Sequence, residues 1–103
     1  MMLYVFIRGL TGRVFKILPL KEAEDRGEEV YLNVYLESLA RDMYGATETF
    51  PELQTMQGYV TALNIVGFLL HNEFTQNVCK REVFKVLGLL NSIEKQLEGA
   101  PNE

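Results

Sequence analysis

The sequence has few of the residues from which enzymes and metal sites are built. It contains one cysteine, one histidine and no tryptophan in 103 residues. A single cysteine, Cys79, excludes an intramolecular disulfide and favours the reducing cytoplasm as compartment. A metal site needs several ligands that face one another, and no Glu-x-x-His pair accompanies His71. We therefore expect no metal and no other cofactor.

Motifs of catalysis are also missing from the sequence. There is no P-loop, no G-x-S-x-G and no G-x-G-x-x-G. Lys80 and a helix N-terminus would favour a reactive thiolate at Cys79, but no second histidine or acid stands ready to form a dyad. We expect Cys79 to pack as a small hydrophobic residue and the protein not to be an enzyme.

The apolar runs are too short for export or membrane insertion. The run from Met1 to Ile7 is interrupted by Arg8, and the run from Tyr59 to Leu70 contains Asn64. A spanning helix needs about 20 apolar residues, and a signal peptide needs a basic leader and a longer apolar core. The sequence predicts a protein that is neither exported nor embedded.

Composition is that of one folded domain. Apolar residues make up 48% and charged residues 23% of the chain, which is too apolar for a disordered protein. The length suits a single core, which we place in residues 1–98, with 99–103 as a frayed tail. The net charge of −4 disfavours direct contact with nucleic acid.

The strongest pattern in the sequence is a long amphipathic helix from Thr75 to Gly99. Thr75 is a good N-cap, and Phe74 precedes it in the position of a hydrophobic staple. Steps of four and three residues separate the apolar positions of the stripe, which are Cys79, Val83, Val86, Leu90, Ile93 and Leu97. Such a seam predicts a helix packed lengthwise against partners.

Helical spacing recurs in the first half of the chain. Residues 3–18 have it, although a strand over residues 3–7 is an alternative, and Pro19 is expected to end the helix. The polar stretch 20–29 is predicted to be a solvated loop with at most one helical turn. A second helix is expected over residues 28–44, with Gly45 as a left-handed cap.

A third helix is expected to begin at Thr49-Phe50-Pro51-Glu52, where Thr49 and Glu52 form a capping box and Pro51 fits the first turn. This helix either runs to His71 or breaks near Gly58 and resumes. Four amphipathic segments with short connections indicate an all-α fold. We predict a compact antiparallel bundle of about four helices with a long C-terminal helix.

Surface chemistry points to a protein partner. Acidic residues cluster between residues 22 and 29, and an acidic patch can dock on a basic groove. Tyr31, Tyr35 and Tyr44 are too many for one stripe to bury, so some are expected at the surface or at an interface, where tyrosine is a favoured anchor. A homo-oligomer contact is an equal alternative for these tyrosines. The predicted partner-binding residues are Glu24, Asp25, Glu28, Glu29 and Tyr31.

Basic residues form a stripe at the start of the last helix. Arg81 and Lys85 are four residues apart and share a face, with Lys80 beside them. Such a stripe can touch phosphates, but it is more often the outer face of a bundle helix, and Glu82 interrupts it. We therefore retain nucleic-acid contact only as an alternative.

Three segments carry a resemblance to a class of small proteins. The stretches 15–22, 45–53 and 79–85 are similar to parts of uncharacterised accessory proteins of phages and mobile elements of low-GC Gram-positive bacteria. The resemblance implies a gene among those of mobile elements, which also encode anti-CRISPR inhibitors. It transfers no functional residue. We expect a non-enzymatic protein that inhibits a host protein such as an RNA-guided nuclease. The alternatives are a self-associating assembly protein and a small nucleic-acid-binding regulator.

Overall fold

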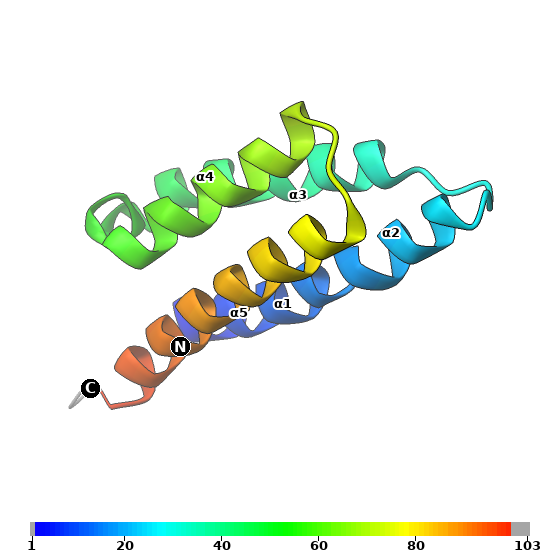
Figure 1. The fold of residues 1–103 in the computed structure, drawn as a ribbon. Helices are drawn as coiled ribbons and strands as arrows, with labels where there is room; N and C mark the ends of the chain where they lie inside the picture. The colour runs from blue at the N-terminus through cyan, green and yellow to red at the C-terminus, as the bar shows by residue number, and fades with distance from the viewer. Residues whose placement is uncertain (1, 100–103) are drawn as a thin grey trace.

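The protein is an antiparallel helical bundle, as the sequence predicts. The computed structural model describes residues 2–99, and these residues contain helices and no strand. The helices are α1 (Met2–Phe15), α2 (Ile17–Asp25), α3 (Leu32–Thr49), the 3₁₀ helix η1 (Pro51–Thr55), α4 (Gln57–His71) and α5 (Gln76–Glu98). Only Lys16 separates α1 from α2, so the two act as one long segment, and the chain then reverses direction at each of three connections (Figure 1). The resulting bundle measures 49 × 22 × 19 Å.

The first segment is helical throughout, which corrects two expectations. Residues 2–15 form α1 rather than a strand, but Pro19 does not end the helix and residues 20–25 are not a loop. Pro19 is the third residue of α2, where its missing N–H is one of the donors that a helix start leaves unpaired in any case. Burial of Ala23 and of the Lys21 stem then stabilises the helix beyond it.

The second helix begins and ends later than predicted. Residues 28–31 precede α3 as an extended connection, and Gly45 lies inside the helix. Gly27 is the one glycine of residues 2–99 with a positive φ, 85°, so the left-handed turn falls after α2 and not at Gly45. Burial of Ala46 against the core accounts for the extra turn of α3.

The predicted start at Thr49 is wrong for an α-helix. Thr49 ends α3, and the residues after it form the 3₁₀ helix η1, with Pro51 in its first position. Phe50 occupies the cap position without a side-chain hydrogen bond, so the capping box does not form. The α-helix starts at Gln57, one residue before the predicted break at Gly58, and ends at His71 as expected.

The long last helix follows the prediction closely. The Thr75 hydroxyl accepts a hydrogen bond from the backbone N–H of Val78 at 3.2 Å, so Thr75 is the N-cap. Five of the six positions in the predicted stripe are fully buried, and Leu97 is partly buried against them. In the same core the Tyr59 ring is fully buried, and its hydroxyl donates to the Met43 carbonyl at 2.6 Å.

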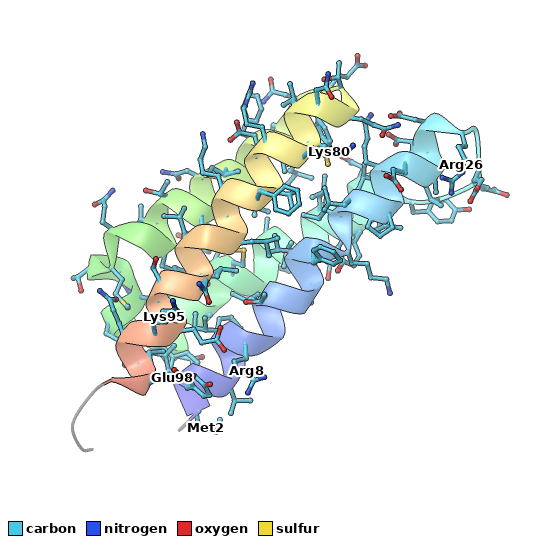
Figure 2. The ribbon with its side chains drawn as sticks, turned by 60° about the horizontal axis from the view of Figure 1, so that its bottom comes forward. Met2, Arg8, Arg26, Lys80, Lys95 and Glu98 are labelled. Carbon is cyan, nitrogen blue, oxygen red and sulfur yellow. The ribbon has the colours of Figure 1, made fainter. Side chains whose placement is uncertain are left out.

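Helices α1 and α5 pack antiparallel along most of their length. The Tyr4 hydroxyl donates to Glu98 at 2.9 Å, and Arg8 pairs with Glu94 at 3.2 Å. Arg8 and Glu98 therefore lie at one end of the bundle, and Arg26 lies at the other (Figure 2). Gly99 caps α5, and the rest of the predicted frayed tail lies outside the described residues. Within residues 2–99, no helix has the length and hydrophobicity needed to cross a bilayer.

Candidate functional site

The five predicted partner-binding residues lie together at the far end of the bundle, on α2 and the turn after it. Their carboxylates are largely engaged within the chain. Lys21 pairs with Glu24 at 3.3 Å and with Asp25 at 3.1 Å. Arg26 pairs with Glu28 at 2.8 Å, and the Tyr31 hydroxyl donates to Glu29 at 3.2 Å. The structure thus brings the residues together, but much of their negative charge is compensated locally.

Lys21 is the centre of this cluster. Its side chain is nearly buried, and its ammonium group lies 5.0 Å from the centroid of the Phe74 ring. Burial alone would lower the pKa of Lys21, but the hydrogen bonds to Asp25 and Glu24 outweigh it and raise the pKa. The hydrogen bond from Lys21 lowers the pKa of Asp25 in turn. Lys21 therefore stays charged and ties α2 to the connection between α4 and α5.

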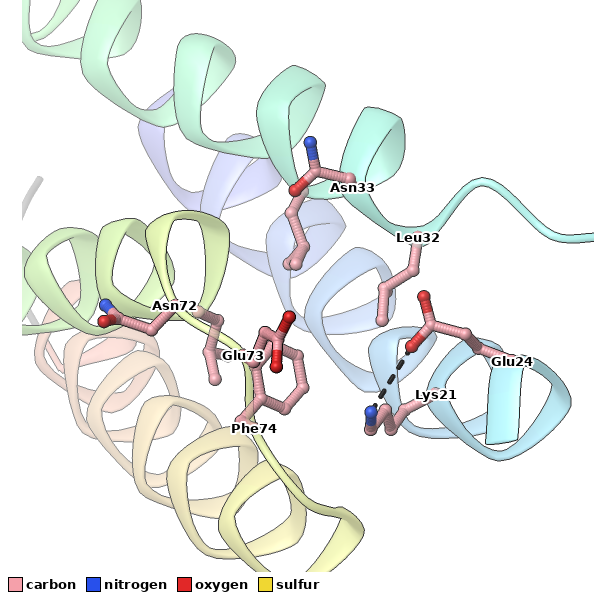
Figure 3. Close-up of a pocket in the computed structure, with 9 residues that line it drawn as sticks. Lys21, Glu24, Leu32, Asn33, Asn72, Glu73 and Phe74 are labelled. Carbon is pink, nitrogen blue, oxygen red and sulfur yellow. Dashed lines mark hydrogen bonds and ion pairs between the residues drawn. The ribbon is translucent and has the colours of Figure 1, made fainter. Parts of the chain in front are cut away.

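A hollow opens beside Lys21 between α2, the start of α3 and the end of α4. It has a volume of about 320 Å³, and its polar lining includes Glu24, Asn33, Asn72 and Glu73 (Figure 3). Its only cation is Lys21, which the carboxylate of Glu24 already engages. The hollow is therefore a polar recess in the surface that leaves its one cation little freedom to receive a further anion.

Chemistry-bearing residues are scattered in the described part of the chain. Among residues 2–99 no three His, Cys, Asp or Glu side chains are placed to hold a metal ion. Cys79 is buried, as predicted, and burial raises the pKa of its thiol to about 11. A thiol with that pKa is almost entirely protonated at neutral pH and is a poor nucleophile. His71 is exposed at the end of α4.

The basic stripe of α5 is partly neutralised by an acid within it. Glu82 accepts from Arg81 at 2.9 Å and pairs with Lys85 at 3.5 Å. The hydrogen bond from Arg81 is the main reason that the pKa of Glu82 is lowered. Only 12% of the Glu82 side chain is exposed, against 65% for Arg81 and 54% for Lys85. The exposed surface at this point is therefore cationic, with the carboxylate lying beneath it.

Two of the three tyrosines in the second predicted helix reach the surface, which confirms the prediction that one stripe cannot bury all three. Tyr31 is 66% and Tyr44 is 67% exposed. Tyr35 is partly buried, and its hydroxyl donates to the Arg13 carbonyl at 2.7 Å. The two exposed tyrosines stand 13 residues apart along the chain and thus near opposite ends of α3, so they do not form one patch.

The surface that sequence reasoning missed belongs to α4. This helix contains no Asp, Glu, Lys or Arg, and positions 53–72 form a run of 20 residues free of those four types. Phe68 lies on its outer side and is 46% exposed, close to the exposed Asn64. A helix on the outside of a bundle ordinarily carries charge on its solvent face. The gap between Glu52 and Glu73 is the signal in the sequence that could have identified this surface.

A groove runs beside this surface, along the seam between α4 and α5. Two hollows of about 280 and 460 Å³ lie on the seam. On α4 their lining residues include Gly58, Thr61, Ile65 and Phe68, which are three or four apart and so share one face. On α5 they include Glu82, Leu89 and Gln96, which are seven apart and also share one face. The two hollows therefore follow one another along the same seam, and we name them together the α4–α5 groove.

The floor of the α4–α5 groove is mostly apolar. Met56, Ile65, Leu89 and Ile93 contribute to it. A Cβ atom added to Gly58 would lie 3.7 Å from the nearest Ile93 atom, so the two helices are already in close contact there.

Comparisons of the chain with known protein families, curated proteins and solved structures give no match. What the protein does must therefore be argued from these surfaces.

Proposed function

We propose that the protein is a non-catalytic protein-binding module that uses the outer face of α4. The observation that carries the proposal is the uncharged surface of α4, on which Phe68 is half-exposed near the end of the helix. The buried centre of a protein–protein interface is depleted in charged residues and enriched in aromatic ones. A half-exposed aromatic ring next to a groove matches the anchor residues that carry most of the binding free energy in such interfaces.

The specific form that we propose is an inhibitor that occupies a surface of a host protein. An RNA-guided nuclease is the first target to test, because the sequence resembles accessory proteins found in the company of anti-CRISPR inhibitors. The acidic cluster at the end of α2 remains a prediction for a second contact.

The experiment compares two substitutions at exposed phenylalanines. Phe68→Asp places a charge within the proposed surface, and Phe15→Asp is its matched control on α1, where Phe15 is 53% exposed. Binding of each purified variant to RNA-guided nucleases is measured by interferometry, and circular dichroism verifies the fold. We expect Phe68→Asp to weaken binding at least about 30-fold, the effect of losing one anchor residue, and Phe15→Asp to leave it unchanged. Equal effects of the two substitutions would refute the proposed surface.

A photo-crosslinking amino acid at position 68 extends the test to unknown targets. The same amino acid at position 15 serves as the control. A host protein captured from lysate at position 68 alone is then purified and titrated against the unmodified protein and the two variants. If every captured protein binds the Phe68→Asp variant as tightly as the parent, the proposed function is wrong.

A further inference from the structure

We infer that the partner segment that fills the α4–α5 groove is an acidic amphipathic helix. The inference rests on the proposed function, because it names the chemistry of the partner at the same surface. Three properties of the groove lead to it: its length, its apolar floor and the charge at one of its ends.

The dimensions of the groove suit a helix of several turns. Glu82 and Gln96 mark its extent on α5 and are 14 positions apart, which corresponds to about 21 Å at the rise of an α-helix. A helix laid in such a groove presents apolar side chains at positions i, i+3 or i+4, and i+7. Those side chains would meet the two hollows in turn, because both hollows lie on the same faces of α4 and α5.

The apolar floor sets the chemistry of the contact face. Ile65 and Leu89 border the hollows and are partly exposed, and the buried Ile93 lines one hollow beside Leu89. Apolar side chains of the partner would cover them and remove that area from water, which is the main source of free energy in such a contact. A wholly polar strand or a nucleic-acid backbone would offer no apolar side chains to pack against this floor.

The charge at the groove has the opposite sign to that of the whole protein. Helix α4 contributes no charged side chain, and the charged groups of the described residues at the groove lie at its α5 side, where Arg81 and Lys85 are exposed around the nearly buried Glu82. A partner therefore meets two exposed cations that one carboxylate only partly neutralises, although the chain as a whole carries a charge of −4. Carboxylates on the flank of a docked helix would pair with Arg81 and Lys85, and ammonium groups there would be repelled.

The test uses two synthetic helical peptides of about 18 residues, enough for five turns. Both carry leucines at the spacing of one apolar face, and they differ only in having glutamates or lysines on the flanks. Binding to the ¹⁵N-labelled protein is followed by amide chemical shifts and by fluorescence anisotropy at low salt. We expect the glutamate peptide to bind at least about fivefold more tightly, with shifts centred on Phe68, Arg81 and Leu89. The preference should shrink in high salt, because exposed ion pairs are screened.

Charge variants identify the two cations. Arg81→Gln with Lys85→Gln should abolish the preference between the peptides, since the amides still donate to Glu82 but carry no charge. Lys16→Gln with Lys95→Gln is the matched control, because it removes two exposed cations elsewhere, and the preference should survive. A preference that survives the first pair, or that is lost in both, overturns the inference.

Three further outcomes would each overturn the inference. The first is equal affinity for the two peptides, or no binding of either. The second is a dimer in light scattering that Phe68→Asp dissociates, which would make a second copy of the chain the occupant. The third is competition by duplex DNA with a steep dependence on salt. The proposed function fails separately, when Phe68→Asp weakens binding of the full-length partner no more than Phe15→Asp does.

Discussion

Four helical glycines should limit the stability of the bundle without serving its packing. Gly9 and Gly12 of α1, Gly45 of α3 and Gly88 of α5 are all exposed. A Cβ atom added at any of them would meet no atom within 4 Å outside its own helix backbone. We therefore expect the simultaneous substitution of all four by alanine to stabilise the protein.

The magnitude follows from helix propensity. Alanine is about 0.8–1.0 kcal/mol more favourable than glycine in a helix interior, largely because glycine loses more backbone freedom on folding. None of the four added Cβ atoms would meet an atom outside its own helix backbone, so the sites share no partner and the effects should nearly add. The total is roughly 3 kcal/mol, which for a domain of this size raises the melting temperature by roughly 12 °C or more.

Urea unfolding followed by circular dichroism measures the change directly. The midpoint should rise with the slope unchanged, because the buried area is the same in both proteins. Gly27→Ala is the control, since its φ of 85° strains any residue with a Cβ atom, and we expect it to destabilise the protein by about 1–2 kcal/mol. A quadruple variant no more stable than the parent would show that the reasoning about these positions is wrong.

Further predictions concern the core, the ion pairs and the acidic cluster. Tyr59→Phe removes the hydroxyl that donates to Met43 and should cost about 1 kcal/mol in urea unfolding. Burial raises the pKa of Tyr59 well above the ordinary value of 10, so the unfolded chain ionises first and stability should fall above about pH 10; this fall should be smaller in Tyr59→Phe. The pKa of Glu82 is lowered by Arg81, so its contribution is present above the unfolded pKa of about 4.3 and is lost as pH falls below it. In Glu82→Gln the urea midpoint should therefore depend less on pH between pH 5 and 3 than in the parent. The same dependence on pH in both proteins would contradict this. The sequence-based hypothesis expects charge reversal at Glu24, Asp25, Glu28 and Glu29 to abolish partner binding. Because ion pairs within the chain hold three of those carboxylates, we expect interferometry to show a smaller loss than for Phe68→Asp, and a larger loss would favour the acidic cluster as the main contact.

The sequence predicted the helices wherever local signals agreed with packing. The α5 stripe and the Thr75 cap act within a few residues of one another, so they could be recognised without the fold. The predictions for Pro19 and Gly45 were wrong because the fold makes each residue acceptable inside a helix, and the sequence does not show the fold. Pro19 falls in the first turn of α2, and Gly45 precedes an alanine that the core buries.

The candidate surface was harder to predict than the fold. The residues of the acidic cluster are indeed neighbours, but the pairing of Glu24 and Asp25 with Lys21 depends on α2 being helical, where the sequence predicts a loop. The absence of charge in α4 is visible in the sequence, where it can equally indicate a fully buried helix. The α4–α5 groove depends on the register between two helices, and composition and spacing carry no information on that register.

The pairing of α1 with α5 has a consequence for folding during synthesis. Helix α1 finds its most extensive neighbour in α5, which is made after the other described helices, across contacts such as Tyr4 to Glu98. Until α5 emerges, the faces of α1 and α4 that pack against it stay uncovered, and the nascent chain is open to aggregation. Closure of the bundle should thus await the synthesis of α5 and, because segments far apart in the sequence must meet, should be slower than in a bundle held by local contacts alone.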